Sequence, residues 1–478
     1  MKDYEVVIGL EVHVELATQS KLFCGCAAKF GADANENVCP ACAGMPGMLP
    51  VTNKQAVSLG IAAALVTNSE ITRTMTFDKK NYFYPDLSTG YQITQWFAPI
   101  CKNGWVDIET SAGKKRITLK QIHIEEDAGK LVHDFRTDTS LVDYNRASVP
   151  LTEIVSNPDF RCAEEVVAYL EKLRDMLSYA GVSDCKMQEG SMRCDVNLSV
   201  REKGSDKLGV RAEMKNMNSL KAITRCIAYE TQRHIDALET GCETLVQQTR
   251  RWDDEKGETF SMREKENATD YRYFPNPDLM PVEISDEWIE EVRRNLPELP
   301  EAKRARYQSE FGLPEYDTNI LTGSIALTRL FERSAEICGS PKDAANWIMV
   351  DLFKLCNDSG TRPEEVSFAP DSLGKLIVMV KDGKINRGTA KKVFAAIFAE
   401  NVDPERYVQE NNLGLMSDSS AIRSTIEQVI AENEKSVNEY KGGKEQAFQY
   451  LIGQSMKALR GQAPAQEVTK LLKDILER

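Results

Sequence analysis

Polar and apolar residues alternate in several short stretches within the first 290 residues, and this is the period of a β-strand. In the first stretch, Leu10–Leu16, the alternation puts Glu11, His13 and Glu15 on one side and apolar residues on the other. The stretches that share this alternation are 10–16, 122–127, 193–200 and 210–215. The pattern therefore predicts at least four strands, each with one polar face.

Helical spacing of apolar residues appears between these strands. Apolar residues recur at this spacing from Val166 to Leu177 and stop before Gly181, a residue typical of the end of a helix. A second helix is predicted from Leu220 to Thr240. Because strands and helices are mixed without a regular β-α-β order, the fold class is predicted to be α+β.

The pattern changes near Leu296–Pro300, where two prolines indicate a boundary. Beyond it the apolar residues follow helical spacing, as in the stripes that begin at Leu373, Val393 and Phe448. We therefore predict three domains: an α+β domain over 1–293, an all-helical domain over 294–404, and a small helical tail domain over 405–478.

Composition narrows the class of protein. The 478 residues are 42% hydrophobic and 28% charged, and 60 Lys and Arg against 73 Asp and Glu give a net charge of −13. These values exclude a disordered chain and a surface coated with basic residues. The N-terminus lacks the pattern of a secretory signal, and no apolar run is long enough for a membrane helix. We expect a cytoplasmic protein without membrane contact, whose cysteines are thiols or metal ligands.

Four of the twelve cysteines lie within one short segment. Cys24 and Cys26 form one close pair, and Cys39 and Cys42 form a second. Two such pairs can supply the four thiolates of a tetrahedral zinc site. The alternative is four ordinary buried thiols, and the clustering favours structural zinc.

The polar strand faces indicate a second kind of chemistry. His123, Glu125 and Asp127 share a face of their strand, Arg193, Asp195 and Asn197 share another, and Arg211, Glu213 and Lys215 a third. Brought into one sheet with Glu11 and His13, they would form an acidic surface suited to Mg²⁺ and a nucleotide phosphate. The alternative is a set of solvated faces. No phosphate-loop, dinucleotide-binding, kinase or serine-hydrolase motif accompanies them.

Aromatic residues are interleaved with cations in two segments, 79–86 and 270–275. Such side chains can stack on adenine or on unpaired bases, or pack as turns on the core. Several longer motifs then resemble those of one family, the B subunit of aspartyl/glutamyl-tRNA amidotransferase. The matching segments are 9–16, 80–86, 123–130, 143–146, 188–197, 215–219, 270–275 and 453–458.

The resemblance implies an antiparallel cradle domain, a helical domain and a tail domain that binds tRNA. It implies an ATP- and Mg²⁺-dependent ligase that phosphorylates the side-chain carboxylate of misacylated Glu-tRNA(Gln) or Asp-tRNA(Asn). Ammonia from a glutaminase A subunit would then form the amide, with a small C subunit joining the pair. At the matching positions, Glu11, His13 and Glu126 would hold Mg²⁺, Glu213 is a further candidate, and Asp195 would line the same pocket. The residues assigned to cofactor binding are Asn197, Lys215, Lys79 and Lys80.

Two features of this assignment lead to structural predictions. Glu126 lies on the opposite alternation phase from Glu125, so a bulge or the start of a turn at these residues is predicted. Where many relatives have Pro-Lys, this chain has Ser88-Thr89, and Lys79 or Lys80 is expected to replace that lysine on the ammonia path. Two other functions stay open: a non-catalytic tRNA-binding scaffold, and a free-standing amide ligase active on a small carboxylic acid.

Overall fold

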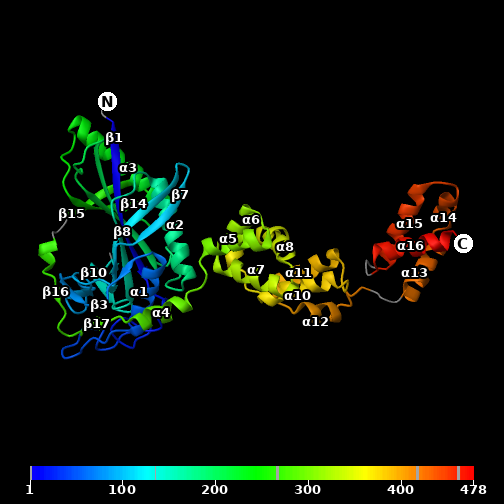
Figure 1. Ribbon diagram of the computed structural model, residues 1–478, viewed down its shortest axis with the longest axis horizontal. Helices are drawn as coiled ribbons and strands as arrows, with labels where there is room; N and C mark the ends of the chain where they lie inside the picture. Colours follow the sequence, from blue (N-terminus) through cyan, green and yellow to red (C-terminus); the bar gives the residue numbers. More distant parts are fainter. Residues whose placement is uncertain (1–2, 135, 265–267, 416–418, 460–462, 478) are drawn as a thin grey trace. The chain divides into compact units, whose positions relative to one another are not determined.

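A computed structural model describes residues 3–134, 136–264, 268–415, 419–459 and 463–477. The chain divides into two units, Met1–Leu299 and Pro300–Arg478 (Figure 1). The first combines a large sheet with helices, and the second is helical in its described part. The predicted α+β class is confirmed. The finer domain boundaries at 293 and 404 stay predictions.

A ten-stranded sheet organises the first unit. Its central strand β1 (Tyr4–Glu15) is antiparallel to both neighbours, β11 (Pro150–Ser156) and β12 (Met192–Glu202). Beyond them, β11 pairs with β8 (Gly113–Glu126) and β12 with β13 (Ala212–Lys215). Four of these five strands, β1, β8, β12 and β13, contain the four predicted stretches to within two residues at their ends.

One pair of strands departs from the antiparallel order. Strand β14 (Gln248–Asp253) runs parallel to β13, and the helix α3 (Leu220–Thr240) makes the connection between them. Parallel neighbours need such a crossover because a tight turn reverses the chain direction. The other strands of the sheet are β15 (Glu258–Glu264), β7 (Trp105–Thr110), β6 (Cys101–Lys102) and β2 (Glu70–Ile71).

Three helices bury the apolar side of this sheet. The alternate β1 residues Leu10, Val12 and Val14 are at most 1% exposed and share one core with α3, α1 (Lys54–Val66) and α2 (Ala163–Tyr179). The predicted helix ends are confirmed: Ser219 caps α3 and Gly241 closes it at a φ of 68°. With one face covered in this way, the polar face of each strand points to the other side of the sheet.

Smaller sheets border the polar face. A three-stranded sheet contains β4 (Asp78–Asn81), β5 (Tyr91–Thr94) and β16 (Phe274–Pro275). The two-stranded sheets are β9 (Lys130–Asp134) with β10 (Thr139–Asp143), and β3 (Thr74–Met75) with β17 (Val282–Glu283). Helix α4 (Asp286–Asn295) follows them.

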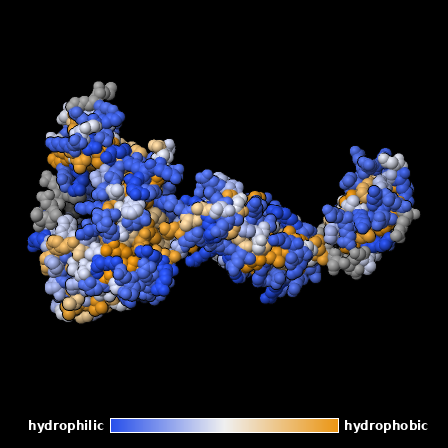
Figure 2. All heavy atoms as spheres, viewed as in Figure 1, coloured by the Kyte–Doolittle hydropathy of each residue, from blue (hydrophilic) through white to orange (hydrophobic). Residues whose placement is uncertain are grey.

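The second unit contains two separate apolar cores within its described residues. The first draws on α5 (Pro300–Phe311), α6 (Glu315–Leu321), α7 (Ile325–Cys338), α8 (Pro341–Asn346), α9 (Phe353–Ser359), α10 (Pro370–Lys381), α11 (Arg387–Glu400) and α12 (Pro404–Glu410). The second draws on α13 (Ser419–Glu432), α14 (Glu434–Lys441), α15 (Glu445–Ala458) and α16 (Ala465–Leu476). The visible face of the chain is mainly hydrophilic (Figure 2). None of the described helices has the length and apolar character needed to cross a bilayer.

Candidate active site

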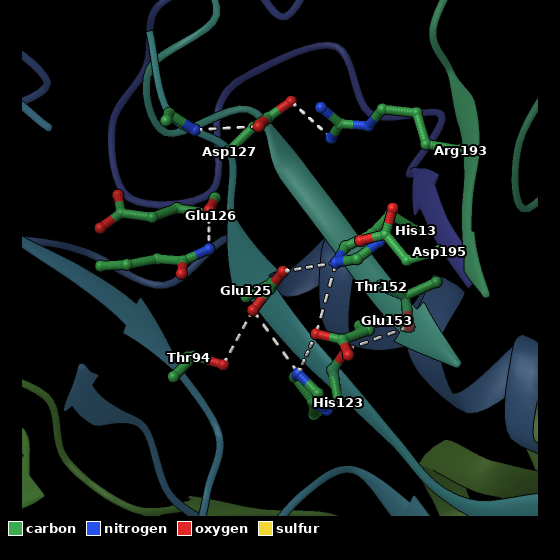
Figure 3. A network of polar contacts seen from close by, with 12 residues as sticks. His13, Thr94, His123, Glu125, Glu126, Asp127, Thr152, Glu153, Arg193 and Asp195 are labelled. Atoms are coloured by element: carbon green, nitrogen blue, oxygen red, sulfur yellow. Dashed lines mark hydrogen bonds and ion pairs between the residues drawn. The ribbon is translucent and has the colours of Figure 1, made fainter. Parts of the chain in front are cut away.

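A row of side chains crosses three neighbouring strands on the polar face. His13 of β1 lies opposite Glu153 of β11, which lies opposite His123 of β8. The Glu153 Oε2 atom is 3.4 Å from His13 Nε2 and 3.0 Å from His123 Nε2 (Figure 3). One carboxylate thus contacts two imidazole rings.

Glu125 completes this group, which we call the histidine–glutamate cluster: His13, His123, Glu125 and Glu153. The Glu125 carboxylate lies 3.7 Å from His13 Nε2 and 3.5 Å from His123 Nε2, and it accepts a hydrogen bond of 3.0 Å from the Thr94 hydroxyl. Only 3% of Glu125 is exposed. Donor atoms of His13, Glu125 and Glu153 lie within 4.8 Å of one another, so these three residues can hold one metal ion.

The cluster is strongly coupled electrostatically. Burial by itself would lower the pKa of His123, but the Glu153 and Glu125 carboxylates overcome it and raise this pKa to about 10. The pKa of His13 is raised in the same way, against burial, chiefly by Glu153. The two imidazoles in turn hold the pKa of Glu153 well below its usual value despite burial. A metal ion that binds His13 would therefore compete with protons for its imidazole nitrogen.

A second group of acids lies beside this cluster on β1, β12 and β13. Glu11 faces Asp195 across the strand pair, and carboxylate oxygens of Glu11, Asp195 and Glu213 lie within 4.8 Å of one another. We call these three residues the carboxylate trio. The Lys215 ammonium forms ion pairs with Asp195 and, at 3.4 Å, with Glu213. Burial opposes the charge on Lys215, yet Asp195 and Glu213 raise its pKa.

Asn197 supplies an oxygen that lacks a partner. Its Nδ2 donates to Glu11 Oε1 at 3.0 Å, while its buried Oδ1 accepts no hydrogen bond from the described residues. Buried amide oxygens are almost always satisfied, so an unsatisfied one beside carboxylates indicates a position for a cation. Three carboxylates and an amide oxygen are the hard donors that Mg²⁺ prefers. The residues therefore fit the ion.

Glu126 lies apart from both groups. Of the two features predicted at Glu125-Glu126, the bulge is wrong: β8 and β11 pair in regular register through Glu126, and the register shift lies at Val155/Ser156. The alternative, a change of chain course, agrees with the end of β8 at Glu126, but it leaves Glu126 in the strand phase. Glu126 consequently keeps the opposite phase and points away from the two histidines (Figure 3). Its Oε1 accepts the Ile93 N–H at 2.9 Å, and burial raises its pKa to about 7. The structure does not place Glu126 with Glu11 and His13.

The predicted lysines lie in the three-stranded sheet beside this face. Lys79 pairs with Asp278 at 2.9 Å and lies 4.4 Å from the Tyr91 ring centroid. Lys80 lies 5.4 Å from the ring centroid of Tyr82 and 5.0 Å from that of Tyr271. Lys80 is thus held by aromatic rings, whereas Lys79 is engaged by an acid.

Four aromatic residues form what we call the aromatic wall: Tyr82, Trp96, Tyr271 and Tyr273. Trp96 and Tyr273 stack at 4.3 Å with 10° between their planes, and Tyr271 contacts both other tyrosines. Burial, and after it the nearby Glu125 charge, raises the pKa of Tyr82 and of Tyr273. The wall therefore lies close to the histidine–glutamate cluster.

The four clustered cysteines converge as predicted. One sulfur from each of Cys24, Cys26, Cys39 and Cys42 lies within 4.8 Å of the others. Cys42 Sγ is 4.0 Å from Cys26 Sγ and 3.9 Å from Cys39 Sγ. Hydrogen bonding from Cys24 is the largest effect that lowers the pKa of Cys42, and the Lys21 ammonium beside it acts in the same direction. The four sulfurs are suited to a tetrahedral metal site.

Comparison with known proteins decides the family. A model described as the GatB/GatE catalytic domain matches residues 6–290, and one described as the GatB domain matches 329–476. The B subunit of the aspartyl/glutamyl-tRNA(Asn/Gln) amidotransferase of Lachnoclostridium phytofermentans is 54% identical over 478 residues, and that of Lachnospira eligens is 54% identical over 484. Each match covers the whole of both chains. This chain belongs to the GatB family.

Within the GatB catalytic domain, sequence reasoning missed two members of the site. Glu153 is the only carboxylate in a strand of otherwise apolar or hydroxyl side chains, and Thr94 lies in a strand that alternation did not indicate. The signal for Glu153 is its place opposite His13, which depends on strand pairing. Glu125 was predicted on the correct face but was not assigned to the metal.

Proposed function

We propose that this member of the GatB family is the subunit that phosphorylates and amidates misacylated tRNA. ATP would transfer its γ-phosphoryl group to the side-chain carboxylate of Glu-tRNA(Gln) or Asp-tRNA(Asn), and ADP would leave. Ammonia from a glutaminase A subunit would attack the activated carbonyl carbon, phosphate would leave, and the amide would lose a proton. The observation that carries this proposal is the pairing of the carboxylate trio with the histidine–glutamate cluster on one sheet face.

The carboxylate trio and the histidine–glutamate cluster can both bind Mg²⁺, with different sets of ligands. Glu11, Asp195, Glu213 and the free Asn197 oxygen would hold Mg²⁺, as would His13, Glu125 and Glu153. Bound Mg²⁺ would offset the negative charge of the transferring phosphoryl group. Lys215 forms an ion pair with Asp195. When a cation binds Asp195 and the other carboxylates instead, the Lys215 ammonium is placed to contact phosphate.

The histidine–glutamate cluster is also suited to proton transfer. Ammonia gives a positively charged adduct that must lose a proton before the amide forms. His123, which is not among the three residues that would hold the metal, contacts the Glu125 and Glu153 carboxylates, so its proton can be exchanged without leaving an isolated buried charge. Burial of the cluster restricts competing hydrolysis by water.

The proposal is tested with the chain assembled with its A and C partners. ADP release and amide formation are measured with ATP and Mg²⁺, with and without misacylated tRNA. The proposal is supported if ADP release and amide formation both require misacylated tRNA. ATP cleavage on free glutamate without tRNA would favour a free-standing ligase, and retention of activity after loss of the cluster would favour a scaffold. A cytoplasmic location stays part of the proposal.

The aromatic wall and Lys80 are proposed to hold the unpaired 3′ end of the tRNA by stacking and phosphate contact. Tyr271→Ala is expected to raise the KM for misacylated tRNA by about 5- to 100-fold, since base stacking contributes about 1–3 kcal/mol per base. Steady-state kinetics at varied tRNA concentration measure this change. Phe260→Ala removes an aromatic ring that contacts Lys256 outside the wall and is the matched control. Equal KM values for both variants would remove the wall from the tRNA site.

A structural zinc ion is proposed at Cys24, Cys26, Cys39 and Cys42, where it would replace apolar core in an irregular segment. Cys39→Ser is expected to lower bound zinc from about one per chain to well below half, because the ion loses one of four thiolates. Elemental analysis of the purified protein measures it. Cys162→Ser, which changes an exposed cysteine, is the control and should keep its zinc. Zinc that stays at wild-type content in Cys39→Ser would contradict the assignment.

A further inference from the structure

A lysine is buried next to the four cysteines. Lys21 is 0% exposed, and its Nζ lies 3.4 Å from Cys42 Sγ and 3.1 Å from the Tyr144 carbonyl oxygen. In the part of the chain that the structure describes, no carboxylate forms an ion pair with it. A buried ammonium is costly unless an anion lies beside it. Of the two groups that Lys21 contacts, only the Cys42 sulfur can carry a negative charge, as it does when it binds a metal ion.

We infer that Lys21 is a positioning residue of the zinc site and donates an N–H···S hydrogen bond to Cys42. Four thiolates with Zn²⁺ carry a net charge of −2, and the Lys21 ammonium reduces it to −1. Cys42 Sγ also accepts the Cys39 backbone N–H at 3.3 Å. Two donors on one sulfur fix its direction and disperse its charge, which stabilises the metal complex.

Lys21 also joins the cysteine segment to the catalytic sheet. Its second acceptor, Tyr144, donates its own N–H to Asn35 Oδ1 at 2.8 Å. Two residues further on, Arg146 donates to the carbonyls of Ala128 and Gly129, directly after β8. Hence the Lys21 ammonium contacts a metal ligand and a loop, and Arg146 of the same loop contacts the segment that follows Glu126.

The simpler role for Lys21 is to satisfy the Tyr144 carbonyl alone. That role predicts a loss of stability on substitution but no change in the metal–sulfur bond. The two roles are therefore separated by measurements on the metal itself.

The experiment compares wild type, Lys21→Met and Lys29→Met as full-length proteins. Lys29 is an exposed lysine of the same segment, so Lys29→Met is the matched control. Zinc transfer to a chromophoric chelator is expected to be about 10- to 100-fold faster in Lys21→Met only. In cobalt-substituted protein, the sulfur-to-metal charge-transfer band should move to lower energy, because a thiolate without its donor is easier to oxidise. Zinc release within twofold of wild type, with an unchanged cobalt spectrum, would overturn the inference.

A second measurement needs no variant. Lysine labelling of the wild-type chain, read by mass spectrometry, should show Lys21 protected while zinc is bound and labelled after a chelator removes it. Lys29 should be labelled in both states. Lys21 that stays protected after zinc removal would contradict a role tied to the metal. The inference rests on the zinc proposal, and metal analysis separates them. A wild-type chain without zinc overturns both, whereas zinc held equally by wild type and Lys21→Met overturns only the role of Lys21.

Discussion

Replacing Glu125 by glutamine is expected to reduce tRNA-dependent ADP release by about 100- to 1,000-fold, the usual loss when one electrostatic stabiliser of a transition state is removed. Glutamine keeps the size of the side chain and can still accept the Thr94 hydrogen bond. It removes the charge, however, so His13 and His123 are left with Glu153 alone. The assembled enzyme is assayed at saturating ATP and Mg²⁺, and bound metal is measured in parallel.

Glu126→Gln provides the sharpest comparison, because it makes the same change one residue further along β8 on the opposite face. The family motif assigns the metal to Glu126, while the geometry assigns it to Glu125. We expect the loss of ADP release to be larger for Glu125→Gln. Glu109→Gln, an exposed carboxylate of β7, should retain wild-type activity. A larger loss for Glu126→Gln would return Glu126 to the metal site and exclude the assignment of the metal to Glu125.

Much of the sheet and its polar face could be predicted because alternation is a local property of each strand. Glu11, His13 and Asp195 lie on the predicted faces, and α3 has the predicted bounds, Leu220 to Thr240. What alternation could not supply was register. Glu153 joins the cluster only because β11 pairs with β1 and β8 at that position, and its sequence neighbours carry no sign of it.

The missing bulge at Glu125-Glu126 has a different cause. Two adjacent glutamates in a strand must point to opposite faces, and the alternation alone places Glu125 with His123. The family motif favours Glu126 instead, and a bulge or the start of a turn at these residues would reconcile the two. A bulge requires an unpaired residue at Glu125-Glu126, yet both residues have partners in β11. The regular pairing therefore leaves Glu125, and not Glu126, on the face that carries His123.

Outside the candidate active site, the substitution with the largest expected effect on the free energy of unfolding is Glu230→Gln. The Glu230 carboxylate is 0% exposed on α3 and forms ion pairs of 2.9 Å with Arg233 and 3.1 Å with Arg250 of β14, and Thr259 of β15 donates to it. Burial opposes its charge, but the nearby His234 ring at 3.5 Å and the hydrogen bonds from Arg233 and Thr259 lower its pKa to about 2. Glu230→Gln is expected to lower the free energy of unfolding at pH 7 by about 3–5 kcal/mol, since the partner charges stay buried.

The lowered pKa of Glu230 predicts how the stability lost in Glu230→Gln changes with pH. A folded-state pKa near 2 against an ordinary value of 4.5 means that the unfolded chain binds more protons between these limits. The contribution of Glu230 is therefore complete above about pH 5.5 and is lost as the pH falls toward 2, below which wild type and variant converge. Thermal unfolding of both proteins from pH 7 to pH 3 measures how the stability gap, the difference in free energy of unfolding between wild type and Glu230→Gln, narrows. Glu239→Gln changes an exposed residue of the same helix and should be as stable as wild type at every pH. A gap for Glu230→Gln that stays constant from pH 7 to pH 3 would show that packing, rather than the buried charge network, joins α3 to β14 and β15.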